Sequence, residues 1–202
     1  GNIRANSPNN VLMAFKSDDQ LSIYLKHNQF SQEHELIKDI KIGNTHFKKG
    51  ELPSNFDSVV KVYFESVLKV AFSNQAMVDG METFFSERTY NPVVEYMEKA
   101  AKEWDGRERI SKMFQVYLGA DDVELVSKIA EMWLIGAVAK VYNPYAKFDY
   151  VLDLVGGQGV GKTSLLQKLG GDWYTDAVTD FENKDNYYIM LKSLIVNDVE
   201  MV

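Results

Sequence analysis

The chain has 202 residues, a net charge of −7, 46% hydrophobic residues and 25% charged residues. This ordinary globular composition excludes disordered, collagen-like and coiled-coil chains. There is no cysteine, which excludes disulfide scaffolds, thiolate zinc sites and cysteine nucleophiles, and the three histidines are scattered. No apolar run reaches the ~18 residues that a membrane span needs, so we expect a soluble intracellular protein without a membrane partner.

The N-terminal third is predicted to mix short helices and strands. Ser7 and Pro8 form an N-cap followed by proline at the first helical position, which predicts a helix through about Phe15. Residues 21–49 combine short apolar runs with turn residues, which predicts a small β element. Residues 50–55 are expected to be a linker.

The chain then becomes helical, with apolar residues at helical spacing. Helices are expected from Asp57, over Asn74–Glu87, from Pro92 to Trp104, over Arg109–Leu118, and from Asp121 or Asp122 to Asn143. The third helix should bury one face, formed by Val93, Met97, Ala101 and Trp104. The last should bury a broader face, formed by Val126, Ile129, Ala130, Trp133, Leu134, Ala137, Val138 and Val141. Core packing is the simplest explanation of both stripes.

The periodicity changes near Phe148. Tyr150–Val155 reads as a buried strand, Lys162–Leu169 as a helix after a glycine-rich turn, and Leu194–Val196 as a second strand. Residues 172–183 are loop-like, and residues 185–191 favour a further helix. We therefore expect an α/β protein: a helical N-terminal part with a small β element, then the start of a P-loop NTPase parallel sheet that is incomplete at the C-terminus. The expected domains are residues 1–53, 54–147 and 148–202.

One motif indicates chemistry. Residues 156–163 match G-x-x-x-x-G-K-[ST] without deviation. Glycines let the backbone wrap a phosphate, and the positive end of the following helix faces it. Lys162 would reach the β- and γ-phosphates of ATP, and the Thr163 hydroxyl would ligate Mg²⁺. A plain glycine-rich turn between strand and helix is the alternative, but it does not call for Lys162 and Thr163 in register. The predicted cofactor-binding residues are Gly156, Gly157, Gln158, Gly159, Val160, Gly161, Lys162, Thr163 and Ser164.

A carboxylate on a neighbouring strand normally completes such a site. Asp198 and Glu200 follow the second predicted strand and are two residues apart, so on a continuing strand they would share a face. We assign Asp198 to the metal and Glu200 to the attacking water, with Lys162 as the third catalytic residue. Alternatively, both carboxylates simply end the strand in solvent. Further strands, a polar sensor and an arginine finger would have to lie beyond Val202, so we expect a fragment or an incomplete domain.

Several separate blocks of residues 90–202 resemble the virulence-associated E (VapE-like) family. They are Tyr90–Met97, Trp104–Gly106, Arg109-Ile110, Trp133–Tyr142, Lys147–Tyr150, Trp173–Asp176, Phe181, Lys184-Asp185 and Leu194–Glu200. The resemblance implies a helicase-like ATPase of superfamily three, carried by phages and pathogenicity islands and acting in replication of the mobile element. It also implies ATP and Mg²⁺ as cofactors, single- or double-stranded DNA as partner, a ring (commonly a hexamer) in the full-length protein, and the cytoplasm of a bacterial host. Val199 departs from the family, whose strands can carry another acidic residue there.

Two alternative functions remain: a small-molecule P-loop kinase, and a non-enzymatic interaction module with a vestigial P-loop. The best candidate for DNA contact is a group of five basic residues near Tyr96 and Trp104, namely Lys99, Lys102, Arg107, Arg109 and Lys112. Because four acidic residues are interleaved with them, we favour a solvated helix face for this segment.

Overall fold

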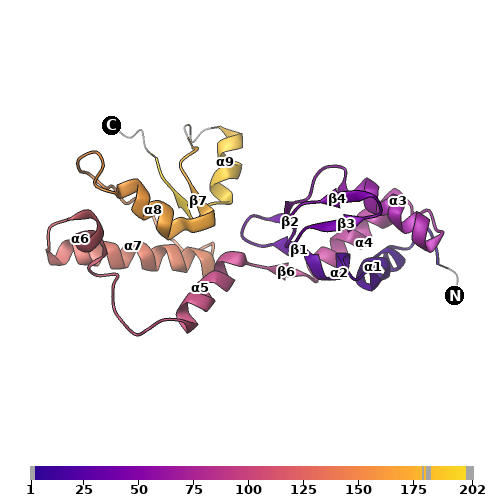
Figure 1. The fold of residues 1–202 in the computed structure, drawn as a ribbon, viewed down its shortest axis with the longest axis horizontal. Coiled ribbons are helices and arrows are strands. Elements are labelled where there is room, and N and C mark those ends of the chain that lie inside the picture. Colours follow the sequence, from indigo (N-terminus) through magenta and orange to yellow (C-terminus); the bar gives the residue numbers. More distant parts are fainter. Residues whose placement is uncertain (1–2, 179, 181–182, 199–202) are drawn as a thin grey trace. The chain divides into compact units, whose positions relative to one another are not determined.

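The structure is a computed structural model, and it describes residues 3–178, 180 and 183–198 (Figure 1). The chain forms two compact units, an N-terminal unit of residues Gly1–Asn91 and a C-terminal unit of residues Pro92–Val202. The segments expected at 1–53, 54–147 and 148–202 divide the chain differently, because the helices between residues 56 and 86 pack with the small strands that precede them.

The N-terminal unit combines four helices with six short strands among its described residues. Its helices are α1 (Pro8–Ser17), α2 (Leu21–Tyr24), α3 (Phe56–Leu68) and α4 (Asn74–Ser86). Its strands are β1 (Leu25–Asn28), β2 (Glu33–Leu36), β3 (Ile40–Ile42), β4 (Thr45–Phe47), β5 (Gly50–Glu51) and β6 (Thr89–Tyr90). The Ser7 side chain accepts a hydrogen bond from the Asn10 backbone N–H, so the predicted N-cap is confirmed.

The predicted small β element is also present. Strands β1 and β2 form an antiparallel hairpin inside a four-stranded sheet of order β5-β2-β1-β6, and β3 pairs with β4 as a separate hairpin. Asn28 is buried, and its side-chain oxygen accepts hydrogen bonds from the backbone N–H groups of Phe30 and Ser31, which fixes the turn after β1. The apolar run before β1 is helical: Leu21–Tyr24 forms α2.

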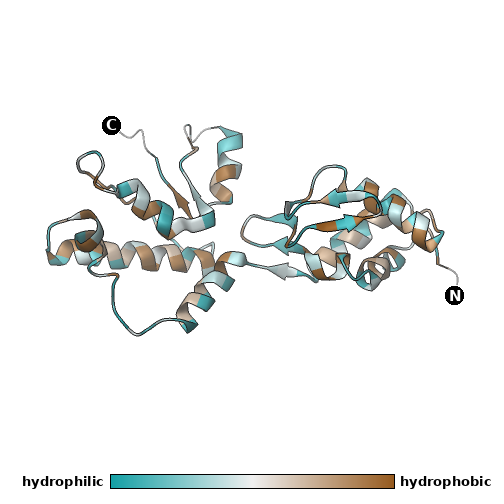
Figure 2. Ribbon diagram, viewed as in Figure 1, coloured by the Kyte–Doolittle hydropathy of each residue, from teal (hydrophilic) through white to brown (hydrophobic). Residues whose placement is uncertain are grey.

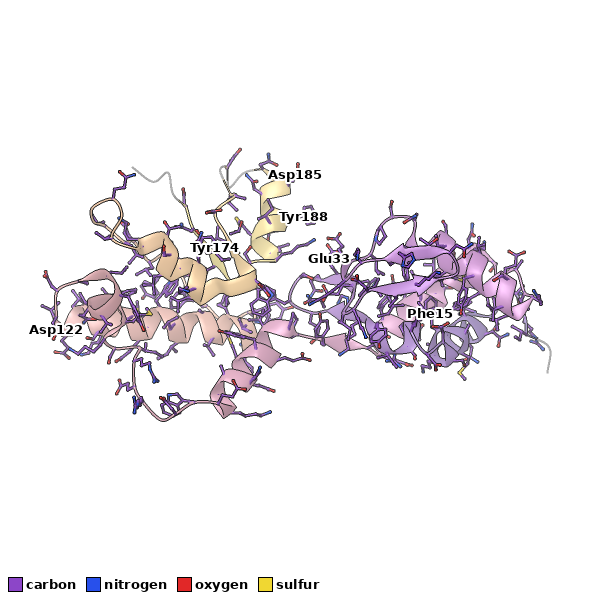
Figure 3. All side chains as sticks on the ribbon, in the orientation of Figure 1. Phe15, Glu33, Asp122, Tyr174, Asp185 and Tyr188 are labelled. Atoms are coloured by element: carbon purple, nitrogen blue, oxygen red, sulfur yellow. The ribbon has the colours of Figure 1, made fainter. Side chains whose placement is uncertain are left out.

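Aromatic side chains fill the core of the N-terminal unit. Phe15 of α1 contacts Phe64 of α3 edge-to-face with ring centroids 5.0 Å apart, and Phe84 of α4 at 5.1 Å (Figure 3 labels Phe15). Helix α1 crosses α4 so closely that a Cβ atom on Gly80 would lie 2.6 Å from Cβ of Val11. This crossing therefore requires glycine at position 80.

We expect Gly80→Ala to destabilise the N-terminal unit. Overpacking costs about 1–3 kcal/mol and outweighs the ~1 kcal/mol that alanine gains in helix propensity. Hydrogen exchange of α4 amides measures the effect, because all three tryptophans lie in the other unit. Val78→Ala, at an exposed position of the same helix, is the control. Equal protection in the two variants would contradict the close crossing.

Two histidines face each other across the β1–β2 hairpin. Nδ1 of His27 lies 3.2 Å from Nδ1 of His34, so one ring must donate and the other accept. His34 also stacks on Phe85 with ring centroids 3.8 Å apart. Burial lowers the pKa of His34, and the neighbouring Glu82 carboxylate opposes this effect. The fold therefore favours a neutral His34.

The stability of the N-terminal unit should fall as the pH drops through the unfolded-state pKa of histidine, about 6.5. Because the folded-state pKa of His34 is lowered, the unfolded chain binds more protons below that pH, and stability is fully present only above it. Hydrogen exchange of β1 and β2 amides at pH 7.5 and pH 5.5 checks this. His34→Phe keeps an aromatic ring on Phe85 and should flatten the pH dependence; an unchanged slope would contradict the assignment.

The C-terminal unit has five helices, one 3₁₀ turn and two short strands among its described residues. The helices are α5 (Pro92–Lys102), α6 (Met113–Leu118), α7 (Glu124–Tyr142), α8 (Lys162–Gly170) and α9 (Lys184–Leu191). The 3₁₀ turn is Gly171–Trp173, and the strands are β7 (Tyr174–Thr175) and β8 (Ile195–Val196), which pair in parallel. Figure 2 shows apolar residues along several turns of α7.

Two helices of this unit, α5 and α6, are shorter than predicted. Helix α5 ends at Lys102, and both Ala101 and Trp104 are exposed, so only the first part of the predicted stripe packs. Helix α6 begins at Met113 rather than at Arg109. The reason is a hydrogen-bonded loop in which Trp104 Nε1 donates to the Arg107 carbonyl at 3.1 Å.

The longest helix largely follows its prediction. Ala130 and Val141 are buried on the expected face of α7, whereas Val138 is exposed. The predicted aspartate cap is wrong: the N-cap is Val123, without a side-chain hydrogen bond. Asp122 pairs with Lys112 instead.

The prediction of a strand at Tyr150–Val155 is wrong in the described structure, where these residues belong to no helix, strand or sheet. The side chains still alternate: Leu152 and Leu154 pack against the core, whereas Val151 and Val155 are 81% and 89% exposed. Among the described residues β7 pairs only with β8, so this segment has the side-chain pattern of a strand without a partner for its backbone. The second predicted strand is present as β8, which pairs in parallel with β7 rather than with residues 150–155.

Side chains from α6, α7 and α8 share one small core. Its buried residues are Met113, Phe114 and Ala130, with Leu118, Leu134, Leu152, Leu154, Leu165 and Leu169 packed around them. Within the described part of the chain, no helix is both long enough and apolar enough to cross a lipid bilayer.

Candidate functional site

The glycine-rich loop of residues 156–161 leads directly into α8. Gly159 and Gly161 adopt positive φ angles of 83° and 97°, a conformation that side chains with a Cβ rarely take. Gly161 is the N-cap of α8, so the loop bends back at the positive end of the helix dipole. Gly159 and Gly161 therefore stand where the backbone requires glycine.

The Lys162 ammonium group holds this loop together. Lys162 Nζ donates hydrogen bonds to the carbonyl oxygens of Gly156 at 2.7 Å and of Gly157 at 3.0 Å. The first residue of α8 thereby reaches back to the first two residues of the loop. These hydrogen bonds hold a positive charge beside the glycine-rich loop, close to the backbone N–H groups of the first turn of α8.

The two strands of the small sheet lie against α8 (Figure 1), and Tyr174 of β7 is labelled beside it in Figure 3. A Cβ atom on Gly170, at the end of α8, would lie 2.7 Å from Cβ of Tyr174 and 3.3 Å from Cβ of Ile195. The end of β8 is tied to β7 as well, because Asn197 Nδ2 donates to the Tyr174 hydroxyl at 2.9 Å. Sequence reasoning missed β7, and Trp173-Tyr174-Thr175 followed by a loop is too short a signal to predict it.

The structure describes most of the predicted site residues. Gln158, Val160, Thr163 and Ser164 belong to the loop and the first turn of α8, and Asp198 lies half-buried two residues beyond β8. Glu200 and Val199 lie outside the described residues, as does Phe181. Helix α8 begins at the loop and packs against β7 and β8, and Asp198 follows β8 in the chain.

The loop and the first turn of α8 provide groups of the kind that bind phosphate and Mg²⁺: an ammonium group, backbone N–H groups at a helix start and a threonine hydroxyl. Asp198 provides a carboxylate two residues beyond β8. Within residues 3–178, 180 and 183–198, no group of three or more His, Cys, Asp or Glu side chains that could hold a metal ion occurs. Magnesium sites beside phosphates do not require such a group, because the phosphates and water supply most of the ligands.

The basic segment between residues 99 and 112 is largely neutralised by its own acidic neighbours. Arg109 donates to both carboxylate oxygens of Asp105, at 2.8 Å and 2.6 Å, and Lys112 pairs with Asp122. The Arg109 guanidinium lowers the pKa of Asp105 well below its usual range. The expected helix face is wrong beyond Lys102, where the chain is a loop, but the segment is solvated and Arg109 and Lys112 are both paired with carboxylates.

A groove outside the loop is lined by residues of α1 and α3 in the N-terminal unit, with a volume of about 480 Å³. One of its polar side chains, Asp18, accepts hydrogen bonds from the Tyr63 hydroxyl and from the backbone N–H of Leu21. Asp18 is thus used by the fold, and the groove has none of the chemistry of the glycine-rich loop.

The family model of the virulence-associated protein E-like domain matches residues 97–202. The chain belongs to this family. The match covers the loop, α8 and β8, and it confirms the resemblance over those residues. Membership suggests a protein associated with mobile genetic elements. No curated protein matches the chain.

We expect Gly170→Ala to destabilise the C-terminal unit by about 1–3 kcal/mol, because the new methyl group would overlap Cβ atoms that belong to β7 and β8. Chemical denaturation followed by tryptophan fluorescence reports on this unit, since Trp104, Trp133 and Trp173 all lie in it. Gln167→Ala, on the exposed side of α8, is the control. A Gly170 variant as stable as the control would mean that α8 does not rest on these strands.

Proposed function

We propose that the protein is an ATP-binding, DNA-dependent ATPase, a replicative helicase or initiator of a mobile genetic element. The observation that carries the proposal is the Lys162 ammonium group bridging two carbonyls of a glycine loop at the start of α8. That arrangement concentrates positive charge and N–H donors at one point, which is what a triphosphate needs. Membership of the family and the parallel pairing of β7 and β8 support the same conclusion.

Each predicted residue takes one role in this proposal. The backbone N–H groups of residues 157–163 and the Lys162 ammonium bind the β- and γ-phosphates of ATP. Thr163 and Asp198 would hold Mg²⁺, which neutralises phosphate charge when bound. Glu200 would orient the water that attacks the γ-phosphorus and accept its proton. The products are ADP and inorganic phosphate, and their release would drive movement along DNA.

We propose DNA binding and ring assembly because proteins that this family resembles act on DNA as rings. Single-stranded DNA should stimulate ATP turnover by a helicase-type ATPase, whereas a small-molecule kinase would turn over a small acceptor without DNA. An interaction module with a vestigial loop would bind no nucleotide. A measurement of ATP hydrolysis with and without single-stranded DNA therefore identifies the ATPase, and nucleotide binding without hydrolysis separates the kinase from the interaction module.

Lys162→Ala should weaken the binding of Mg²⁺–ATP more than tenfold, because it removes hydrogen bonds to a charged group worth about 1.5–3 kcal/mol. Isothermal titration calorimetry measures the affinity. Lys168→Ala removes an equal charge from the exposed side of the same helix and should leave the affinity within about twofold. Equal affinities for the two variants would overturn the assignment of the nucleotide site.

A further inference from the structure

The antiparallel pairing of β1 with β2 brings two of the three histidines of the chain together. His27 and His34 are directly opposite each other in the register, so their side chains leave the same face of the hairpin. The two residues are seven positions apart in the chain, a spacing that looks scattered in the sequence. The hairpin therefore creates a pair of imidazole rings that no sequence motif predicts.

The two rings approach each other through their Nδ1 atoms, which are 3.2 Å apart in His27 and His34. Two nitrogens bound to one tetrahedral zinc ion at about 2.0–2.1 Å are about 3.3 Å apart, whereas a square-planar ion would bring them to about 2.8 Å. The observed separation therefore suits a tetrahedral ion. A single shared proton can hold the same two atoms together, and a bound ion would replace that proton.

The environment of His34 leaves its Nδ1 atom available for an ion. The Glu82 carboxylate lies 3.6 Å from Nε2 of His34, the ring nitrogen that does not face His27. A carboxylate there favours the ring proton on Nε2 and leaves a lone pair on Nδ1, which is the usual arrangement of a metal-binding histidine. Because burial lowers the pKa of His34, the ring is also in the neutral form that binds metals.

Charge and packing around the pair suit a cation as well. Glu33, Asp57 and Glu82 each interact electrostatically with His34 (Figure 3 labels Glu33). The His34 ring stacks on Phe85 with an interplanar angle of 6°, so its orientation is fixed before an ion arrives. Both histidines are only half-buried, and an ion can reach them from solvent.

We infer that His27 and His34 bind a divalent transition-metal ion, with Zn²⁺ the best fit, through their Nδ1 atoms. No group of three or more His, Cys, Asp or Glu side chains that could hold an ion occurs in the described part of the chain, so water would complete the coordination. With two protein ligands, the dissociation constant should be on the order of micromolar. The ion would clamp β1 to β2. This inference does not depend on the proposed nucleotide site, which belongs to the other unit.

Calorimetric titration of the whole chain with Zn²⁺, in the absence of nucleotide, tests the site. His27→Asn and His34→Phe should each weaken zinc binding at least about tenfold, because each removes one of two ligands. His46→Asn is the matched control: it removes the third histidine, which is exposed on β4, and should leave the affinity within about twofold. An excess of Mg²⁺ should not displace the zinc, because Mg²⁺ prefers oxygen ligands.

The unsubstituted chain provides a second measurement that does not depend on how a variant folds. NMR spectra of the ring nitrogens should show that Zn²⁺ shifts Nδ1 of His27 and His34 but neither nitrogen of His46. At 100 times its dissociation constant, zinc should slow hydrogen exchange of β1 and β2 amides by up to about 100-fold, because it binds only the folded hairpin.

Four results would overturn the inference. They are an absence of zinc binding to the unsubstituted chain, zinc binding that is unchanged in both His27→Asn and His34→Phe, equal ring shifts at His46, and unchanged exchange of the β1 and β2 amides. In each case the 3.2 Å contact between the two rings is a hydrogen bond of the fold and not a metal site.

Discussion

The contact between the Lys162 ammonium and the carbonyl oxygens of Gly156 and Gly157 is the interaction on which the candidate site depends. It ties the beginning of the loop to the beginning of α8, so the loop cannot open without losing two charge-assisted hydrogen bonds. The positive φ angles of Gly159 and Gly161 make the bend possible, and the lysine then holds it. The same ammonium group that would bind phosphate thus shapes its own binding site.

The support for this loop comes from two directions. Leu118 of α6 packs on one side, and β7 and β8 lie against α8, where Gly170 allows the closest approach. A helix held at both ends keeps its N-terminal N–H groups in a fixed direction. Ordering flexible groups costs free energy on binding, and donors that are already fixed avoid this cost. Packing that holds α8 in place therefore favours tight binding of a ligand at its N-terminus.

Sequence patterns correctly predicted those features that depend only on neighbouring residues in the chain. The cap at Ser7, the helix after Gly161 and the end of α6 at Leu118 each depend on one or two residues and are confirmed. The start of α6 was missed because Arg109 bonds to Asp105, four residues earlier, in a loop that looks helical by spacing alone. Strand β7 is two residues long and exists through its pairing with β8, a contact that no window of sequence reveals. The prediction of a strand at residues 150–155 was wrong because alternating apolar residues form a strand only when a neighbouring strand pairs with their backbone. For the site, the motif predicted the loop, but the nearness of Leu118 to Gly161 depends on tertiary packing between residues 43 positions apart.

The unpaired segment from Tyr150 to Val155 affects how the protein behaves in solution. Its backbone donors and acceptors belong to no sheet among the described residues, and two of its valines project into water. A stretch of this kind is a template for adding a strand from another polypeptide. Concentrated samples should therefore be prone to edge-to-edge aggregation at this segment, and a lysine in place of Val151 would act as a gatekeeper against it.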